Sequence, residues 1–174
     1  MDRIAIIGCG GSGKTVLAHH LADRLGFAVI SLDALYYDQE WTAASLEQFA
    51  ATQREVVAGN QWIIDGNYAS TLPIRLARAD TLIFLDLPTL TCLFGIVVRR
   101  WRYRGGQHPD GVYDRISWSF IRYILKYRRV MRPQIHRLVT DHGRPSALVR
   151  LTSRRRIRRY LAQLSALRAQ PDQP

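Results

Sequence analysis

The sequence predicts an α/β protein in which helices flank a parallel sheet of five strands. Five short apolar runs alternate with segments whose apolar residues recur at helical spacing. A glycine-rich segment at residues 8–15 joins the first apolar run to the first helical segment. The order strand, glycine loop, helix at the start of the chain therefore predicts both the fold class and an anion site.

The glycine-rich segment has the complete spacing of a phosphate-binding loop: Gly8, Cys9, Gly10, Gly11, Ser12, Gly13, Lys14 and Thr15. Glycines let consecutive backbone N–H groups curl around an anion, and the helix that opens near Lys14 adds its positive end. Lys14 is expected to reach the outer phosphates, and the Thr15 hydroxyl to bind Mg²⁺. The segment therefore predicts ATP and Mg²⁺ as cofactors, against the alternative of a glycine-rich turn that matches by chance.

The remaining elements follow from the same periodicities. Strands are expected at Ile4–Ile7, Phe27–Ile30, Trp62–Ile64, Asp80–Leu85 and Ala147–Leu151. Helices are expected from the glycine loop to Leu25, over 45–57, over 71–77 as a short helix or turn, around 90–101, over 116–131, over 135–139, and after Ser153. Pro133 is expected to kink or interrupt the long helical pattern around it.

The helix around 90–101 carries an apolar face, which predicts that this face packs inward. Its members are Leu90, Leu93, Phe94, Val97 and Trp101.

Polar residues follow the predicted strands, where an open parallel sheet binds its ligands. Asp33 either orders Mg²⁺ or contacts a phosphoryl acceptor, or it is a helix cap. Asp65 ends a buried strand, which favours a site role, including a metal role, because a buried carboxylate needs a partner. Asn67 either binds substrate or shapes the turn, and Asp86 has the same alternatives as Asp33.

Charge is divided unevenly along the chain. Residues 1–98 carry six Arg or Lys and ten Asp or Glu, whereas residues 99–174 carry nineteen and four, within a net charge of +11. An arginine-rich lid over a polyphosphate, at about 99–115, is one interpretation; a solvated helix face and nucleic-acid binding are the others. Genomic base composition also favours arginine in some chains.

The 174 residues suit one domain, expected over 1–169 with a disordered tail at 170–174. No stretch is apolar enough for a membrane span. The first strand begins directly after residue 3, which leaves no room for a signal peptide and predicts a cytoplasmic protein. Two cysteines, Cys9 and Cys92, are too few for a disulfide framework.

The chain resembles P-loop NTPases of the nucleoside-monophosphate kinase type and, more narrowly, the adenylate kinase-like bacterial proteins labelled DNA topology modulation protein. The resemblance rests on the loop at 8–15, on Leu32-Asp33, on Trp62-Ile63-Ile64-Asp65-Gly66-Asn67-Tyr68, on Asp86-Leu87-Pro88, and on Arg99-Arg100. It implies a three-layer fold with strand order 2-3-1-4-5. It also implies that Arg99 or Arg100, and Arg104 from the lid, neutralise the transferring group, while Ser153 and Arg154 pack against adenine.

The chain departs from adenylate kinases where they bind AMP. Ala34-Leu35-Tyr36 and Asn67-Tyr68 stand where those enzymes carry acceptor-binding arginines, and the nearest arginine downstream is Arg75. We therefore expect Asp33, Asp65, Asn67, Arg75 and Arg104 to form the substrate site. The lid holds His108 where relatives of the topology-modulation group tend to have arginine.

The leading hypothesis is an ATP-dependent kinase that transfers the γ-phosphoryl group to a small acceptor, with a nucleotide or nucleoside favoured. Lys14, Arg99, Arg100 and Asp33 are the predicted catalytic residues. A nucleotide-gated protein acting on nucleic acid is the second hypothesis, supported by the basic second half of the chain. A kinase acting on a sugar or a shikimate-like alcohol is the third. The oligomeric state is left open by the sequence.

Overall fold

A computed structural model describes residues 1–38, 40, 42–103, 117–142 and 145–168. Five parallel strands form one sheet in the order β2-β3-β1-β4-β5. The strands are β1 (Arg3–Gly8), β2 (Val29–Ser31), β3 (Trp62–Asp65), β4 (Thr81–Leu85) and β5 (Ala147–Leu151). The predicted fold class, the five strands and their order are thus confirmed.

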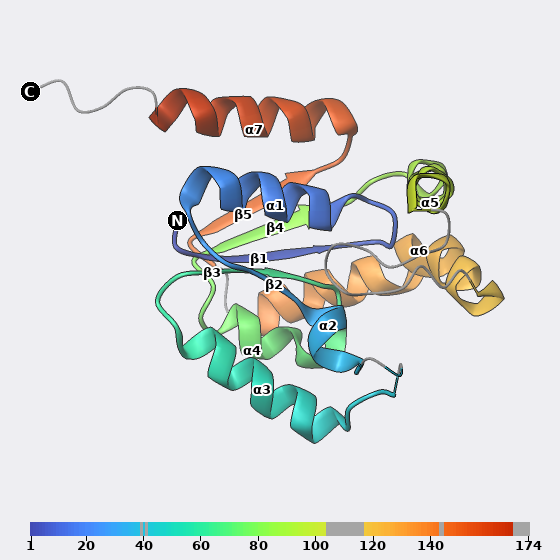
Figure 1. The fold of residues 1–174 in the computed structure, drawn as a ribbon, viewed down its shortest axis with the longest axis horizontal. Helices are drawn as coiled ribbons and strands as arrows, with labels where there is room; N and C mark the ends of the chain where they lie inside the picture. The colour runs from blue at the N-terminus through green and yellow to red at the C-terminus, as the bar shows by residue number, and fades with distance from the viewer. Residues whose placement is uncertain (39, 41, 104–116, 143–144, 169–174) are drawn as a thin grey trace, which may run out of the picture.

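Helices cover both faces of the sheet (Figure 1). One face carries α1 (Lys14–Leu25) and α7 (Arg154–Arg168), and the other carries α3 (Leu46–Ala58), α4 (Leu72–Leu76) and α6 (Trp118–Asp141). The short helix α2 (Leu32–Tyr36) follows β2, the 3-10 turn η1 (Ala69–Thr71) precedes α4, and α5 (Thr89–Tyr103) crosses the end of the sheet. None of the described helices is long and apolar enough to cross a bilayer.

Two apolar layers hold the sheet between these helices. Alternate residues of β1 point to opposite faces: Ile4 and Ile6 belong to the layer under α1 and α7, whereas Ala5 and Ile7 belong to the layer on the α3, α4 and α6 side. All four are fully buried. A strand buried on both faces reads as a continuous apolar run, which is why β1 was visible in the sequence.

Local signals end and begin the helices as expected. Gly26 closes α1 in a left-handed conformation with φ of 77°, and its N–H donates to the Ala22 carbonyl. Ser45 and Gln48 form a capping box at the start of α3, with each side chain accepting from the other residue's backbone N–H. These caps fix where α1 ends and where α3 begins.

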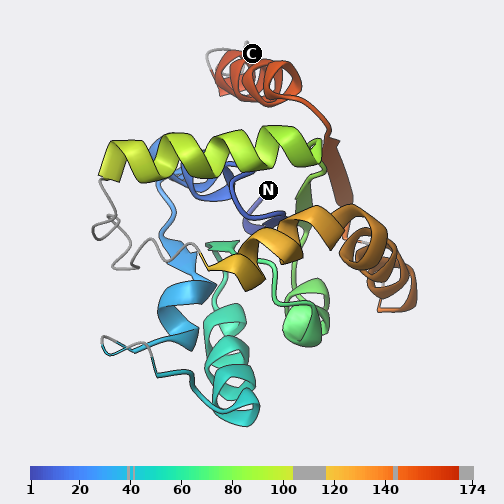
Figure 2. The same ribbon diagram turned by 90° about the vertical axis from the view of Figure 1, so that its right-hand side faces the viewer.

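Two expectations about helices differ from the structure. Pro133 does not interrupt α6, which continues from residue 118 to 141 with Pro133 inside it and is bent in Figure 2. Most of the predicted apolar face of α5 does not pack inward: Leu90, Phe94, Val97 and Trp101 are exposed. Leu93 is the member of that face that packs against the core, beside the buried Cys92 and Ile96. Periodicity identified the helix, but α5 is apolar on two sides, so periodicity could not decide which side is buried.

Asp80 fastens the start of β1 to the start of β4. Its Oδ2 accepts hydrogen bonds from the backbone N–H groups of Asp2 and Arg3 at 3.0 and 2.9 Å, and its Oδ1 accepts one from the Thr81 hydroxyl at 2.8 Å. Burial alone raises the pKa of this carboxyl, but the hydrogen bonds to the ionised form outweigh it and lower the pKa below 3.8.

The lowered pKa predicts a pH-dependent contribution to stability. The contribution is complete above the unfolded-state pKa of 3.8 and is lost as the pH falls through the folded-state value. Asp80→Asn is expected to lower the free energy of unfolding by about 1 kcal/mol at pH 7 and to flatten its decline in acid. Urea titrations from pH 7 to pH 2 measure both effects. Asp23→Asn, at an exposed site on α1, is the control, and equal acid slopes for wild type and Asp80→Asn would contradict the prediction.

Candidate functional site

The strand register brings the polar segments that follow the strands to one edge of the sheet. Asp65 at the end of β3 pairs with Ser31 at the end of β2 and with Ile6 of β1. Leu85 at the end of β4 pairs with Gly8 of β1 and with Leu151 of β5. The glycine loop, Asp33, Asp65, Asp86 and Ser153 therefore all lie at the carboxyl edge of the sheet, the edge at which open parallel sheets bind ligands.

The glycine loop is a tight turn between β1 and α1. Gly11 and Gly13 have φ of 72° and 90°, which side chains rarely adopt. The Ser12 N–H donates to the Cys9 carbonyl at 3.2 Å, and Lys14 Nζ donates to the same carbonyl at 3.3 Å. Because α1 begins at Lys14, the unpaired N–H groups of its first turn open onto the loop. The local geometry is that of an anion-binding loop with one mobile cation.

Helix α5 approaches the glycine loop backbone to backbone at Gly11 and Gly95. A Cβ on Gly11 would lie 2.2 Å from the Cys92 carbonyl oxygen, and a Cβ on Gly95 would lie 2.1 Å from the Gly11 carbonyl oxygen. Both positions therefore require glycine. One signal for this contact is present in the sequence: Gly95 lies in the interior of a helical pattern, where glycine costs about 1 kcal/mol relative to alanine.

The thiols of Cys9 and Cys92 interact where α5 meets the loop, and both are buried. The hydrogen bond that the Cys9 thiol donates to Cys92, followed by burial, raises the pKa of Cys9 well above its usual range, whereas the same bond lowers the pKa of Cys92. Ser12 is also fully buried. On the α6 side, the ring of Phe120 lies where a Cβ on Gly10 would be, 2.5 Å from its nearest atom. Side chains of α5 and α6 thus pack against the loop.

Thr15 and Asp65, both predicted to bind metal, are in direct contact. The Thr15 hydroxyl donates to Asp65 Oδ2 at 2.5 Å, although the two residues lie 50 positions apart. Asp65 is 5% exposed. Hydroxyl and carboxylate oxygens are the hard ligands that Mg²⁺ prefers, and Mg²⁺ is commonly held by few protein ligands together with phosphate oxygens. The donor set beside the loop therefore fits Mg²⁺ bound to a polyphosphate.

Arg154 reaches the glycine loop from the first turn of α7. Its Nη2 donates to the Gly11 carbonyl at 3.4 Å, and its Nη1 lies 2.9 Å from the position of a Cβ on Gly13. Ser153 caps α7, with its Oγ accepting from the Arg156 N–H at 3.2 Å. The guanidinium of Arg154 thus adds a second cation to the loop, in addition to Lys14.

Asp33 lies in the first turn of α2, exposed, beside a group of aromatic rings. The Tyr68 hydroxyl donates to Asp33 Oδ1 at 2.8 Å. Burial, and then the Asp33 charge, raise the pKa of Tyr68 above its usual range, so the hydroxyl remains a donor. The ring centroids of Tyr36, Phe49 and Tyr68 lie 4.8 to 5.1 Å apart. Asp33 is therefore an oriented carboxylate next to aromatic surface.

Asn67 is bound by two tyrosines of α6. Its Nδ2 donates to the Tyr123 hydroxyl at 2.9 Å, and its Oδ1 accepts from the Tyr127 hydroxyl at 3.1 Å. Burial raises the pKa of both tyrosines above the usual range. These contacts hold the segment after β3 against α6. Of the two roles that we considered for Asn67, shaping the local structure is the one its contacts support.

Arg75, which the sequence predicts to contact substrate, lies in the protein interior. It is fully buried, and its guanidinium donates to the carbonyls of Gly66, Asn67 and Tyr68 at 2.8, 3.3 and 2.9 Å. Burial lowers the pKa of Arg75 to about 9, partly offset by the charge of Asp65, which leaves the side chain protonated at neutral pH. The sequence showed an arginine near the site but not that three carbonyls already occupy it.

Asp86 is likewise occupied within the protein. Its carboxylate accepts from Arg150 Nε at 2.9 Å and lies 3.3 Å from Arg132 Nε and 3.9 Å from Arg128 Nε. The Asp86 side chain is 1% exposed, while the arginines remain partly exposed. The buried Asp86 carboxylate and its arginine partners therefore connect the end of β4 to β5 and to α6.

The predicted lid is only partly described. Arg99, partly buried, and Arg100, exposed, lie in the last turns of α5. Arg104, His108 and the rest of the lid to residue 115 fall outside the described residues, as does the predicted tail at 170–174.

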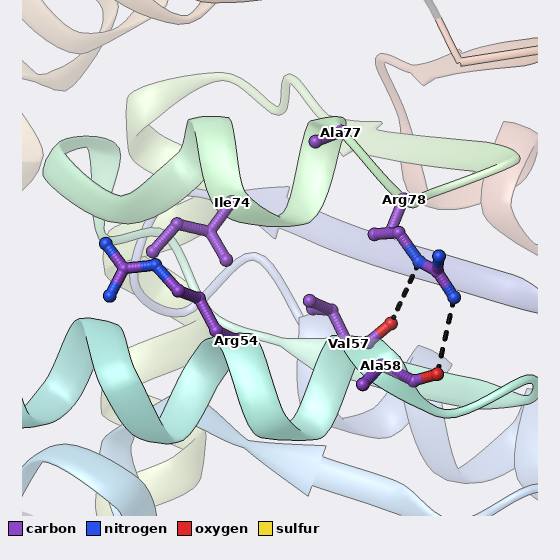
Figure 3. A pocket seen from close by; sticks show the side chains of 6 residues that line it. All are labelled: Arg54, Val57, Ala58, Ile74, Ala77 and Arg78. Atoms are coloured by element: carbon purple, nitrogen blue, oxygen red, sulfur yellow. Dashed lines mark hydrogen bonds between the residues drawn. The ribbon is translucent and has the colours of Figure 1, made fainter.

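A pocket of about 370 Å³ lies between α3 and α4 rather than at the glycine loop (Figure 3). Its walls are mostly aliphatic, and Arg78 donates across one end to the carbonyls of Val57 and Ala58, both at 3.3 Å. These are carbonyls of the last turn of α3, which lack partners within the helix. The lining residues are Arg54, Val57, Ala58, Ile74, Ala77 and Arg78. Arg78 therefore closes the end of α3, and the pocket is separate from the candidate site.

Solved structures of kinases share this fold. Shikimate kinase from Acinetobacter baumannii in complex with shikimate aligns with a TM-score of 0.58 at 16% identity, covering 97% of this chain and 93% of that one. A gluconokinase from Sinorhizobium meliloti 1021 gives 0.52 at 18%, covering 95% and 93%. Deoxyadenosine kinase from M. mycoides with bound dCTP gives 0.51 at 13%, covering 94% and 98%. No protein-family model and no curated protein matches the sequence.

These similarities show the fold of P-loop kinases over nearly the whole chain. The identities are too low to carry an acceptor from one protein to another, and the three kinases named act on different compounds. The narrower resemblance to the topology-modulation group therefore stays a prediction.

Proposed function

We propose that this protein is a kinase that transfers the γ-phosphoryl group of Mg·ATP to a hydroxyl group of a small acceptor. The contact between Thr15 and Asp65 carries the proposal, because it joins a hydroxyl and a carboxylate beside a glycine loop with a lysine. The P-loop kinase fold supports it.

Each residue of the site has a distinct task in this proposal. The N–H groups of the glycine loop and the first turn of α1 hold the phosphates, while Lys14 neutralises the outer ones. Thr15 and Asp65 would hold Mg²⁺, which supplies charge neutralisation across the β and γ phosphates. Arg154 adds positive charge beside Gly11, and Arg99 or Arg100 would serve the transferring group.

The acceptor is proposed to bind beside Asp33 and to be a nucleoside. Asp33 is exposed and oriented by Tyr68, so it can accept the proton of an attacking hydroxyl. The neighbouring rings offer stacking surface of the kind that nucleobases use. The site offers less to an acceptor that already carries a phosphate, because the guanidinium of Arg75 donates to three backbone carbonyls instead of to that phosphate. A sugar or shikimate-like alcohol is the runner-up, since it also needs only Asp33.

The deciding experiment is a phosphoryl-transfer panel with Mg·ATP. Nucleosides, nucleoside monophosphates, sugars and shikimate are offered in parallel, and products are read by ³¹P NMR and by ADP release. A nucleoside product is expected, and Asp33→Asn is expected to lower kcat by about 10²-fold or more. Turnover of monophosphates alone would overturn the hydroxyl assignment, and no turnover with any acceptor would overturn the kinase.

Arg154 gives a separate prediction about nucleotide affinity. Arg154→Ala is expected to weaken binding of a non-hydrolysable ATP analogue about tenfold, because a charge-assisted contact contributes roughly 1.5 kcal/mol. Isothermal titration calorimetry measures the change. Arg155→Ala, exposed on the same helix, is the control for net charge. Equal losses for the two variants would show that long-range charge, rather than the position of Arg154, is responsible.

Nucleic-acid binding remains a second candidate function because α7 exposes a dense arginine group: Arg155, Arg156, Arg158 and Arg159. Such a surface predicts an affinity for oligonucleotides that falls steeply with salt. Fluorescence anisotropy with single- and double-stranded DNA between 50 and 300 mM NaCl tests it. Micromolar or weaker binding that does not change with ATP would leave only non-specific charge attraction and would exclude nucleotide gating.

A further inference from the structure

Helix α5 leaves a continuous apolar stripe in water. Leu90, Phe94, Val97 and Trp101 are 79, 68, 65 and 84% exposed, and we name these four residues the α5 seam. The opposite side of the helix is also apolar, with Cys92 and Ile96 buried in the core at 0 and 3%. A surface helix of a globular protein normally has one apolar stripe and one polar face. None of the described helices or strands covers the second stripe of α5, and a partner outside the single chain would explain it.

We propose that the α5 seam is the interface of a homodimer, in which α5 of one protomer packs antiparallel against α5 of a second copy. Figure 2 shows α5 on the near side of the molecule, with none of the described helices or strands in front of it. The proposal concerns assembly and is independent of the proposed kinase activity.

The spacing of the seam fits a helix as its partner. Its residues are separated by four, three and four positions, which is the 3.5-residue repeat of paired helices. A narrow stripe of this kind matches one facing helix, whereas helices that lie on lipid surfaces present a wider apolar arc. The chemistry of the stripe therefore favours a protein partner over a membrane.

The area of the seam fits a dimer. Taking the exposed fractions, its four side chains leave roughly 500 Å² of apolar surface in water, using about 150–250 Å² for each aromatic side chain and less for Leu90 and Val97. That value lies in the upper part of the range for the largest patches on monomeric proteins. It is more than half of the roughly 800 Å² that each partner contributes to a standard interface. Val98, which is 41% exposed and lies beside the stripe, extends it.

Charge selects the antiparallel direction. Arg100 and Arg102 lie in the last turn of α5, so a parallel pair would bring both arginine ends together. An antiparallel pair places them at opposite ends, about 20 Å apart along a 15-residue helix and beyond the Debye length of about 8 Å at physiological salt. In that arrangement a two-fold axis passes between Phe94 and Val97, and Leu90 lies opposite Trp101 of the partner. The seam is self-complementary, as a two-fold interface must be.

The first test is the mass of the full chain in solution. Sedimentation velocity and light scattering between 1 and 100 μM are expected to show a dimer for wild type. Phe94→Asp is expected to weaken dimerisation by at least 100-fold and to run as a monomer. Val130→Asp, at an apolar site on α6 that is 56% exposed, is the control and is expected to stay dimeric. A monomeric wild type, or a dimer unaffected by Phe94→Asp, would overturn the proposal.

A second test keeps the proposal falsifiable if Phe94→Asp does not fold. Leu90→Cys and Trp101→Cys proteins are mixed and oxidised. The antiparallel pair is expected to give a cross-linked heterodimer in the mixture and little product from either protein alone, with wild type, whose two cysteines are buried, as the background. Products from Leu90→Cys alone would instead indicate a parallel pair. If the wild type is monomeric and sediments with vesicles of phosphatidylserine and phosphatidylcholine, and Phe94→Asp abolishes this sedimentation, the seam binds lipid and the dimer proposal is overturned.

Discussion

Lys14→Ala is expected to abolish phosphoryl transfer, lowering kcat/KM by about 10³-fold or more, since kinase catalysis rests mostly on positioning and charge neutralisation at the phosphates. The side chain makes one described hydrogen bond, to the Cys9 carbonyl at 3.3 Å, so its loss is expected to leave the fold unchanged. Affinity for the ATP analogue is expected to fall as well.

Lys126→Ala provides the matched control, because Lys126 is the other lysine of the chain and is exposed on α6. Both variants are assayed with the best acceptor of the panel, and their thermal unfolding is compared with that of wild type. Normal turnover by Lys14→Ala would remove the glycine loop from the mechanism. An equal loss in Lys126→Ala would show that overall charge, rather than Lys14, supports the reaction.

Arg75→Met is expected to give the largest loss of stability, about 3 kcal/mol, because it leaves three carbonyl groups without their buried donor. The segment from Gly66 to Tyr68 is expected to lose its fixed conformation in this variant, because Arg75 donates hydrogen bonds to its three backbone carbonyls. Arg75→Lys is expected to recover only part of it, since an ammonium group lacks the planar fork that reaches all three oxygens.

Denaturant unfolding with Arg78→Ala as the control measures the effect. Arg78 also donates to two carbonyls, but from an exposed position, so its removal is expected to cost well under half as much. If Arg75→Met kept its stability and instead lost acceptor affinity, Arg75 would return to the substrate site that the sequence suggested.

Much of the fold was predictable because its signals are local. The run Ile4–Ile7 is buried on both faces and therefore continuously apolar, and the spacing from Gly8 to Thr15 leaves one arrangement of strand, loop and helix. The proximity of Thr15 and Asp65 could also be inferred, because Asp65 ends one strand, Thr15 follows the loop after another, and parallel strands end at the same edge of a sheet.

The features that escaped prediction depend on tertiary contacts that no local pattern encodes. The carbonyls that bind Arg75 lie only seven to nine residues before it, but no residue pattern there distinguishes a buried arginine from an exposed one. The tyrosines that bind Asn67 lie 56 and 60 residues away. The orientation of α5 escaped for another reason. Both of its sides are apolar, so the burial of Cys92 rather than Phe94 is decided by which side allows Gly95 to reach Gly11.

The backbone contact between Gly11 and Gly95 couples any movement of α5 to the glycine loop. The two backbones leave no room even for a Cβ at Gly11 or Gly95, so a displacement of α5 must carry the loop with it or open the contact altogether. Amide hydrogen exchange is the observable that separates these cases. Amides of the loop and of the middle of α5 are expected to exchange together, at rates slower than those of the last turn of α5.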